Sequence, residues 1–172
     1  MPLYAFRDKK PIIEDSTWVA PSAVIIGDVR IGSRCWIGPG AVIRADFGSI
    51  RIGDETAIED GVVIHCADRV EIGHKIIIGH MAMIHGCSIG DSCIIGMHST
   101  VCDKAVIGAW SIVAEHSLVK RGQVIGEGVF GGVPAVFKYA IEQRHRDYLE
   151  WGVRMYVDLS IEYAQGFQRI SK

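Results

Sequence analysis

Valine or isoleucine recurs every six residues along most of this chain. Three runs of such anchor positions, at 25–43, 52–64 and 72–84, precede a longer run formed by Ile89, Ile95, Val101, Ile107, Val113, Val119 and Ile125. The position two residues before each anchor is mostly small or β-branched, as at Ala23, Cys93 and Ser99. Side chains two residues apart on an extended strand share a face. Each strand is therefore expected to send one bulky and one small side chain into a common interior.

A period of six predicts short strands of about four residues, each followed by a two-residue corner. Three such sides make a coil of about 18 residues, and successive coils stack about 4.8 Å apart through backbone hydrogen bonds. The predicted fold class is an all-β solenoid, a parallel β-helix of triangular section. A β-sandwich with short strands is the alternative, but its strands recur every 8 to 12 residues instead of every six.

The six-residue period is interrupted three times. The spacing is nine from Ile43 to Ile52, eight from Ile64 to Ile72 and five from Ile84 to Ile89. Insertions in a solenoid lie at its corners, where loops shape a site. After residue 136 apolar residues follow helical spacing, which predicts one or two helices over 137–168 with Gly152 as an interruption. We therefore expect a β-helix domain at 1–136 and a C-terminal helical segment at 137–172 that packs on it.

Composition narrows the class of protein. The chain has 172 residues and a net charge of −2 without a basic run, so a single domain that does not bind nucleic acid is expected. It contains no apolar run of about 18 residues that would span a membrane, and its first residues lack the apolar core of a signal peptide. Five cysteines without framework spacing suggest a reducing, cytoplasmic environment. Cys35, Cys87 and Cys93 occupy small inward positions, where cysteine acts as an apolar filler.

Four of the seven histidines lie between residues 62 and 87. Because anchors point inward, the residue after an anchor points outward. His65 follows Ile64 and His85 follows Ile84, and their separation of 20 residues equals one coil plus a two-residue slip. We expect the two imidazoles to stack on adjacent coils of one outer face, at a distance that suits a shared metal ion.

His80 stands at a corner, two residues after Ile78. Five extended residues span up to about 17 Å, so one chain is not expected to bring His80 to the ion that His65 and His85 share. In a cyclic trimer, His80 of one subunit would meet the other two across an interface. Three imidazoles with an open fourth position define a catalytic zinc site. Solvated surface side chains are the simpler interpretation for the remaining histidines, His74, His98, His116 and His145.

Two segments, "VIRADFGSIRIGDETAIEDGVVIH" and "IGHMAMIHGC", resemble the γ-class carbonic anhydrases and their bacterial hexapeptide-repeat relatives. The resemblance runs over nearly the whole chain. It implies a left-handed β-helix, and a homotrimer with zinc or iron(II) between subunits at His65, His80 and His85. The implied reaction is that of a lyase, in which metal-activated water attacks CO2 to give bicarbonate.

The resemblance also implies roles for further residues. Arg44 and Asp46 would pair across the interface beside the metal, Asp60 would help to fix Arg44 or the solvent network, and Tyr156 would approach the site from the final helix. This chain departs from the family pattern twice. Phe47 stands where archetypal members carry a glutamate that shuttles protons, and Glu59 stands where the family usually has glutamine.

Other functions stay open at this stage. "RADFG" and "IIGMHSTV" look more like a subgroup encoded with phenylacetate or carnitine catabolism, for which acyl-CoA thioester hydrolysis has been proposed. Such a substrate would need a basic cleft, and Lys120–Arg121 is the only adjacent basic pair in the later coils. Acyl transfer, which many hexapeptide proteins perform, is a third function. A non-enzymatic trimer that binds metal or a partner is a fourth.

Overall fold

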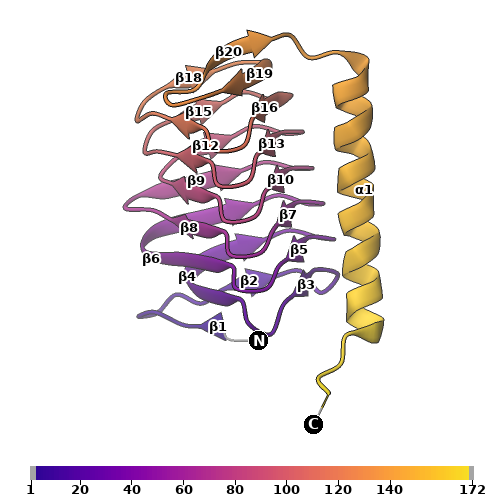
Figure 1. Cartoon of the computed structure of the whole chain (residues 1–172). Coiled ribbons are helices and arrows are strands. Elements are labelled where there is room, and N and C mark those ends of the chain that lie inside the picture. The colour runs from indigo at the N-terminus through magenta and orange to yellow at the C-terminus, as the bar shows by residue number, and fades with distance from the viewer. Residues whose placement is uncertain (1–2, 171–172) are drawn as a thin grey trace.

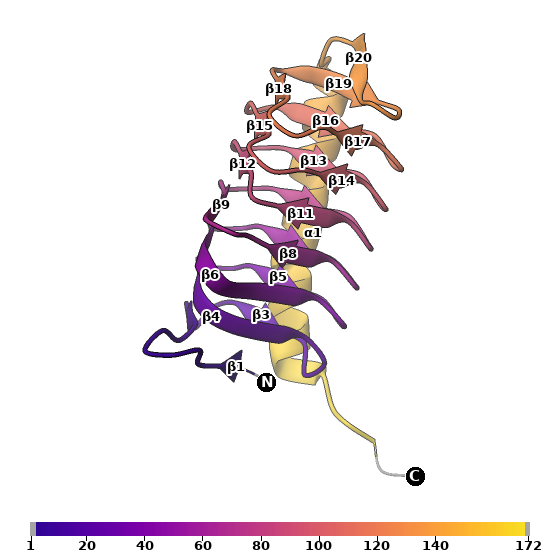
Figure 2. The ribbon, with the colours of Figure 1, turned by 90° about the vertical axis from the view of Figure 1, so that its left-hand side faces the viewer.

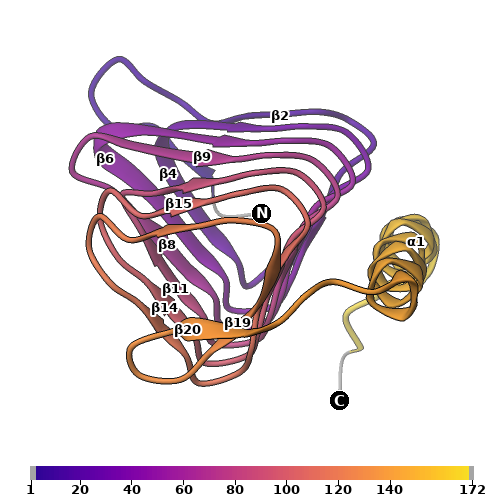
Figure 3. The ribbon, with the colours of Figure 1, turned by 90° about the horizontal axis from the view of Figure 1, so that it is seen from above.

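The computed structural model describes residues 3–170 as a parallel β-solenoid of about seven turns beside one long helix. The coils wind left-handedly, and seen from above the section is triangular (Figure 3). Both features confirm the fold class that the six-residue period and the resemblance predict. The left-handed winding departs from the usual right-handed connection between parallel strands.

Two sheets make up the three sides. The eight-stranded sheet forms one side and contains β3 Trp18–Val19, β5 Trp36–Ile37, β7 Ala57–Ile58, β10 Ile77–Ile78, β13 Ile94–Ile95, β16 Ser111–Val113, β19 Gly128–Gly131 and β20 Val136–Tyr139. The twelve-stranded sheet contains β1 Leu3–Tyr4, β2 Ile12–Ile13, β4 Val24–Ile31, β6 Val42–Ile52, β8 Val63–His65, β9 Arg69–Ile72, β11 Met83–His85, β12 Ser88–Ile89, β14 Thr100–Val101, β15 Val106–Ile107, β17 Leu118–Val119 and β18 Val124–Ile125. It covers two sides because β4 and β6 each pair on both of them.

The anchors form the core. Ile37, Ile58, Ile78 and Ile95 lie in register on successive coils and are each 0% exposed. Every other anchor is also buried, as are the small residues two positions earlier. Burying an isoleucine side chain stabilises a fold by about 1.5–3 kcal/mol. The interior is thus a stack of branched side chains that holds each coil in place on the next.

The corners use an unusual backbone conformation. Within residues 3–170, ten residues other than glycine have a positive φ, all between 54° and 61°. Left-handed backbone costs an L-residue roughly 1–2 kcal/mol. The cost is offset because the corner N–H groups bond the preceding coil, as Lys75 does to the Asp54 carbonyl at 2.9 Å. Side chains at equivalent corners consequently stand in fixed columns on the outside.

The interruption between Ile43 and Ile52 lies within β6, where the chain passes from one side of the solenoid to the next. Gly48 sits at the bend, and a Cβ there would lie 1.7 Å from the Asp68 carbonyl oxygen of the next coil. Only glycine fits such a close approach. Phe47 at this bend is 74% exposed, and its ring lies beside His65. The strands β6, β8 and β11 lie side by side on one face of the solenoid (Figure 2).

The C-terminal segment differs from its prediction at the start, and in the middle it forms one helix, the first of the two predicted alternatives. Residues 136–139 form β20, which pairs antiparallel with β19 and covers the open end of the solenoid. One helix, α1 Gln143–Gly166, follows without a break at Gly152. Gly152 is buried where α1 packs against Ile77. The approach is so close that a Cβ on Gly152 would lie 2.8 Å from Ile77 Cδ1. In this structure α1 runs along the eight-stranded side of its own chain (Figure 1).

The buried cysteines generate a test of this core. Burial raises the pKa of Cys35 to about 11 and the pKa values of Cys87 and Cys93 to about 12, so these thiols stay protonated at pH 8. We expect one thiol per native chain, the half-exposed Cys102, to react with an aromatic disulfide at pH 8, and all five to react after denaturation. Cys102→Ser should remove the native reaction. Rapid modification of a second thiol in the native protein would contradict the packing.

Candidate functional site

His65 and His85 end neighbouring parallel strands, β8 and β11, and are register partners. The parallel ladder places one imidazole above the other on the outer face. His65 Nδ1 lies 3.1 Å from His85 Nε2, and the ring planes make an angle of 61°. The side chains are 17% and 31% exposed. The structure therefore brings these two predicted ligands together, with one nitrogen of each ring directed at the other.

The other ring nitrogen of each histidine faces a carboxylate. His65 Nε2 lies 2.9 Å from Asp46 Oδ1, and His85 Nδ1 lies 2.7 Å from Asp103 Oδ1. Burial alone would raise the pKa of Asp46, but hydrogen bonds from His65 and Arg44 hold it below its usual value. A carboxylate behind a ligating histidine fixes its tautomer and orientation. Asp46, His65, His85 and Asp103 thus form one row on the outside of the solenoid, with a carboxylate at each end.

Sequence reasoning missed Asp103. Cys102 and not Asp103 is the register equivalent of His85 on the next coil, because Ile84 pairs with Val101, so the outward column did not point to Asp103. Arg44 and Asp46 form an ion pair with each other within the chain, and their predicted pairing across an interface stays a prediction. They are two residues apart on β6, so their side chains share its outer face.

A second cluster surrounds His80. Its Nε2 lies 3.1 Å from Glu59 Oε2 and its Nδ1 lies 3.4 Å from Asp60 Oδ2, while its backbone N–H donates to Glu59 Oε2 at 2.8 Å. Glu59 is 6% exposed because α1 covers it, and the Tyr156 hydroxyl donates to Glu59 Oε1. Burial, this hydrogen bond and the charge of Glu59 raise the pKa of Tyr156 above its usual value. Glu59, Asp60 and Tyr156 thus gather around His80, and not around His65.

The two clusters stay separate within one chain. Over residues 3–170, no three His, Cys, Asp or Glu side chains are arranged to hold a metal ion. Asp60 Oδ1 is buried, and the described part of the chain offers it no hydrogen-bond partner. A metal on either nitrogen of His80 would displace a carboxylate or include it in its coordination sphere. Each cluster is therefore part of a metal centre at most, and a centre with all three histidines needs a second copy.

The remaining histidines have local partners. His74 Nδ1 accepts the Asp54 N–H at 3.0 Å, and His145 Nδ1 accepts the Glu142 N–H at 2.9 Å where α1 begins. His98 and His116 stack on each other at successive corners, with ring centroids 4.9 Å apart. These contacts account for each position structurally.

A cavity of about 220 Å³ opens beside His80, between α1 and the eight-stranded side. Its wall is largely apolar, with Ile77, Ile94 and Met97 from the solenoid and Trp151 and Met155 from α1. Glu59, His80 and Tyr156 also line it, so the polar cluster and the apolar space are continuous. An apolar cavity with a few convergent polar groups is the usual form of a small-molecule site.

Comparison with known proteins identifies the family of this chain. The family model described as bacterial transferase hexapeptide (six repeats) matches residues 10–45 and 86–121. The mitochondrial γ carbonic anhydrase 2 of Arabidopsis thaliana is 35% identical over 176 residues, which cover 95% of this chain and 63% of that protein. The carnitine operon protein CaiE of a Proteus species is 37% identical over 172 residues, which cover 96% of this chain and 86% of that protein.

A solved structure gives the same result. The hexapeptide transferase family protein from Anaplasma phagocytophilum superposes with a TM-score of 0.91 at 34% identity, over 94% of this chain and 98% of that one. This chain therefore belongs to the hexapeptide-repeat family that includes the γ carbonic anhydrases and the CaiE proteins. Its relatives are carbonic anhydrase-like and transferase-like. Within residues 3–170, α1 is the only helix, and it is too polar to cross a membrane.

The contact between Tyr156 and Glu59 generates a test of the second cluster. Tyr156→Phe removes the donor from a buried carboxylate, so the free energy of unfolding should fall by about 1–3 kcal/mol. Tyr148→Phe is the matched control, because Tyr148 is 61% exposed on the same helix. Urea unfolding measures both. Equal stability of the two variants would show that the hydrogen bond does not hold α1 on the solenoid.

Proposed function

We propose that this chain hydrates CO2 reversibly to bicarbonate as a metal-dependent homotrimer. Zinc, or iron(II), would be held by His65 and His85 of one chain and His80 of the partner subunit. Each chain carries both clusters, so a ring of three closes with a site at each interface.

One observation carries the metal assignment: His65 Nδ1 and His85 Nε2 are 3.1 Å apart, each on a ring backed by a carboxylate. Nitrogen ligands on tetrahedral zinc at about 2.0–2.1 Å lie about 3.4 Å from each other. Two neutral imidazoles at this separation need only a small adjustment to share an ion. The donor set therefore fits zinc chemically as well as geometrically.

When bound, the metal supplies a Lewis acid that lowers the pKa of a coordinated water. The protein residues supply orientation and charge. Asp46 and Asp103 would each accept the remaining N–H of one imidazole and so fix its tautomer and orientation, and Arg44 holds Asp46 in turn. Glu59 lies beside His80 with its second oxygen bonded by Tyr156. A carboxylate here, where an amide is usual, raises the pKa of nearby water and moves activity to higher pH.

The proton released by hydration needs a route to solvent. Phe47 offers none, because a phenyl ring neither donates nor accepts protons. Its ring lies edge-on to His65, with centroids 6.1 Å apart, and stands exposed at the edge of the face. Turnover therefore depends on external buffer, and carbonic anhydrase activity that rises with buffer concentration is part of the proposal.

A second candidate reaction is hydrolysis of an acyl-CoA thioester at the same metal. The cavity beside His80 favours it, because an apolar space of about 220 Å³ exceeds what CO2 occupies and suits an acyl group. Water activated by the metal would attack the thioester carbonyl, and the C–S bond would break to release the acid and the CoA thiol. CO2 hydration stays the first candidate, since the described basic groups form no evident cleft for the CoA phosphates beside this cavity.

His80→Ala tests the shared metal directly. Protein purified without chelator should contain about one metal per chain, and the variant should lose both the metal and the activity because one of three ligands is missing. His116→Ala replaces an exposed histidine at another corner and should behave as the wild-type protein. Hydration of CO2 and hydrolysis of acetyl-CoA are assayed on the same preparations. Activity that persists in metal-free His80→Ala would refute both candidates, and thioester hydrolysis without CO2 hydration would select the second.

Asp103→Asn tests the carboxylate behind His85. An amide cannot fix the neutral tautomer as firmly, so metal affinity should fall by about 10–100-fold while the fold is retained. Competition with a coloured chelator measures the affinity. Asp158→Asn makes the same charge change on the exposed side of α1 and should leave the affinity unaltered. An unchanged affinity in Asp103→Asn would remove Asp103 from the site.

A further inference from the structure

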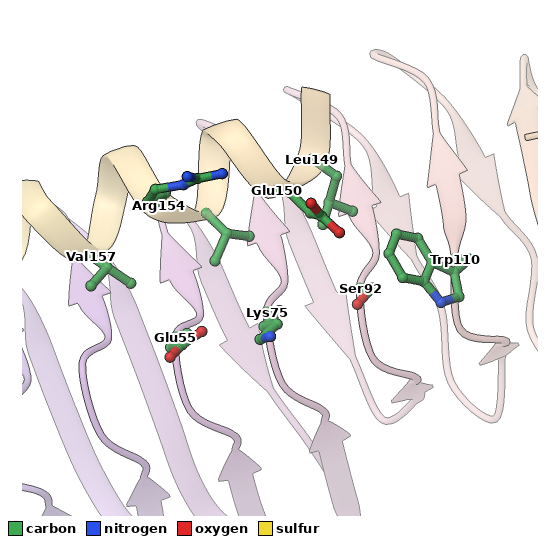
Figure 4. A pocket seen from close by; sticks show the side chains of 9 residues that line it. Glu55, Lys75, Ser92, Trp110, Leu149, Glu150, Arg154 and Val157 are labelled. Carbon is green, nitrogen blue, oxygen red and sulfur yellow. The ribbon is translucent and has the colours of Figure 1, made fainter. Parts of the chain in front are cut away.

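A second cavity lies at the other edge of α1, away from His80. It has a volume of about 390 Å³, within the range of small-molecule sites. One wall is a corner column of the solenoid, with Glu55, Lys75, Ser92 and Trp110 on successive coils, and the other wall is α1 (Figure 4). None of the residues that the proposed metal centre uses lines this cavity.

The corner wall is rigid. Lys75, Ser92 and Trp110 all have left-handed backbone, with φ of 56°, 56° and 59°. The N–H of Ser92 bonds the His74 carbonyl at 2.9 Å, and that of Trp110 bonds the Asp91 carbonyl at 3.1 Å. The side chains therefore leave the backbone in fixed directions toward the helix. Groups held on a rigid scaffold are already oriented for a ligand.

The uncommitted charge in this cavity is mainly positive. Glu55 is engaged by Arg34, which does not line the cavity. Lys75 on the corner wall and Arg154 on the helix form no ion pair within residues 3–170, and Figure 4 shows them on opposite walls. Glu150 is the one other carboxylate in the lining, and it is four residues before Arg154 without pairing to it within the described chain. The two cations without an ion pair outnumber the one carboxylate without an ion pair, so an anion would balance the charge of the cavity.

The remaining lining adds a hydroxyl and an apolar floor. Ser92 is 7% exposed, and its hydroxyl takes part in none of the side-chain hydrogen bonds found in residues 3–170. The hydroxyl oxygen itself is not fully enclosed, so it is accessible to a ligand in the cavity. Leu149 and Val153, 2% and 5% exposed, form the apolar part. One face of Trp110 already carries the Arg146 guanidinium, 4.2 Å from the ring, so Trp110 acts as a fixed wall.

We propose that this cavity binds a small organic anion, a carboxylate or a phosphate monoester. The charged group of the anion lies between Lys75 and Arg154 and accepts a hydrogen bond from Ser92. The apolar part of the anion lies on Leu149 and Val153. The site is distinct from the proposed metal centre and does not depend on it.

The test is a titration of the metal-loaded protein with butyrate and, separately, with inorganic phosphate. The indole N–H signal of Trp110, assigned with Trp110→Phe, reports binding by NMR. We expect a saturable shift with at least one probe at millimolar concentrations. Lys75→Gln and Arg154→Gln should each weaken binding by about tenfold or more, because each removes a charged hydrogen bond. Ser92→Ala should weaken it by a smaller factor.

Two controls locate the site. Lys104→Gln removes a lysine with the same left-handed backbone, φ 61°, from a different corner, and should leave the affinity unchanged. His80→Ala should leave it unchanged as well, which separates this site from an anion bound at the metal. Saturation by butyrate alone identifies a carboxylate site, and saturation by phosphate alone identifies a phosphate ester site. The proposal would be overturned if neither probe saturates, or if Lys75→Gln and Arg154→Gln bind the probe as tightly as the wild-type protein.

Discussion

The parallel hydrogen-bond ladder between coils is the constraint on which the rest of this structure depends. The backbone N–H and C=O groups of each coil form hydrogen bonds with the coils on either side. The Gly96 N–H, for example, donates to the Val113 carbonyl at 2.7 Å. The inward isoleucines prevent any coil from slipping, because a shift of one residue would turn the core side chains outward. The position of a residue within a coil consequently decides which residues lie above and below it.

The first cluster is a direct product of this ladder. His65 and His85 stand at equivalent outward positions on successive coils, Asp103 reaches His85 from the corner of the next coil, and Asp46 reaches His65 from the bend in β6. No loop needs to fold around the site, so little conformational entropy is lost in forming it. The interruptions of the repeat lie beside these residues, where the bend at Gly48 brings Asp46 within hydrogen-bonding distance of His65.

The helix makes a different contribution. By lying along the eight-stranded side, α1 turns an outward position into a buried one at Glu59 and encloses a cavity along each of its edges. One cavity is continuous with His80 and the other holds Lys75 and Arg154. A solenoid face alone is nearly flat, and the added helix is what gives this protein concave surfaces of two different characters, one largely apolar and one charged.

The six-residue period by itself determined the solenoid, its inward residues and the stacking of His65 on His85, because backbone ladders convert spacing in sequence directly into position in space. It did not locate β20 or the start of α1, since helical spacing over 141–167 says little about where a helix begins. It also missed the environment of Glu59 and the pairing of His85 with Asp103. Burial of an outward residue depends on which face a distant helix covers. That choice rests on packing, such as Gly152 against Ile77, which only the tertiary structure decides.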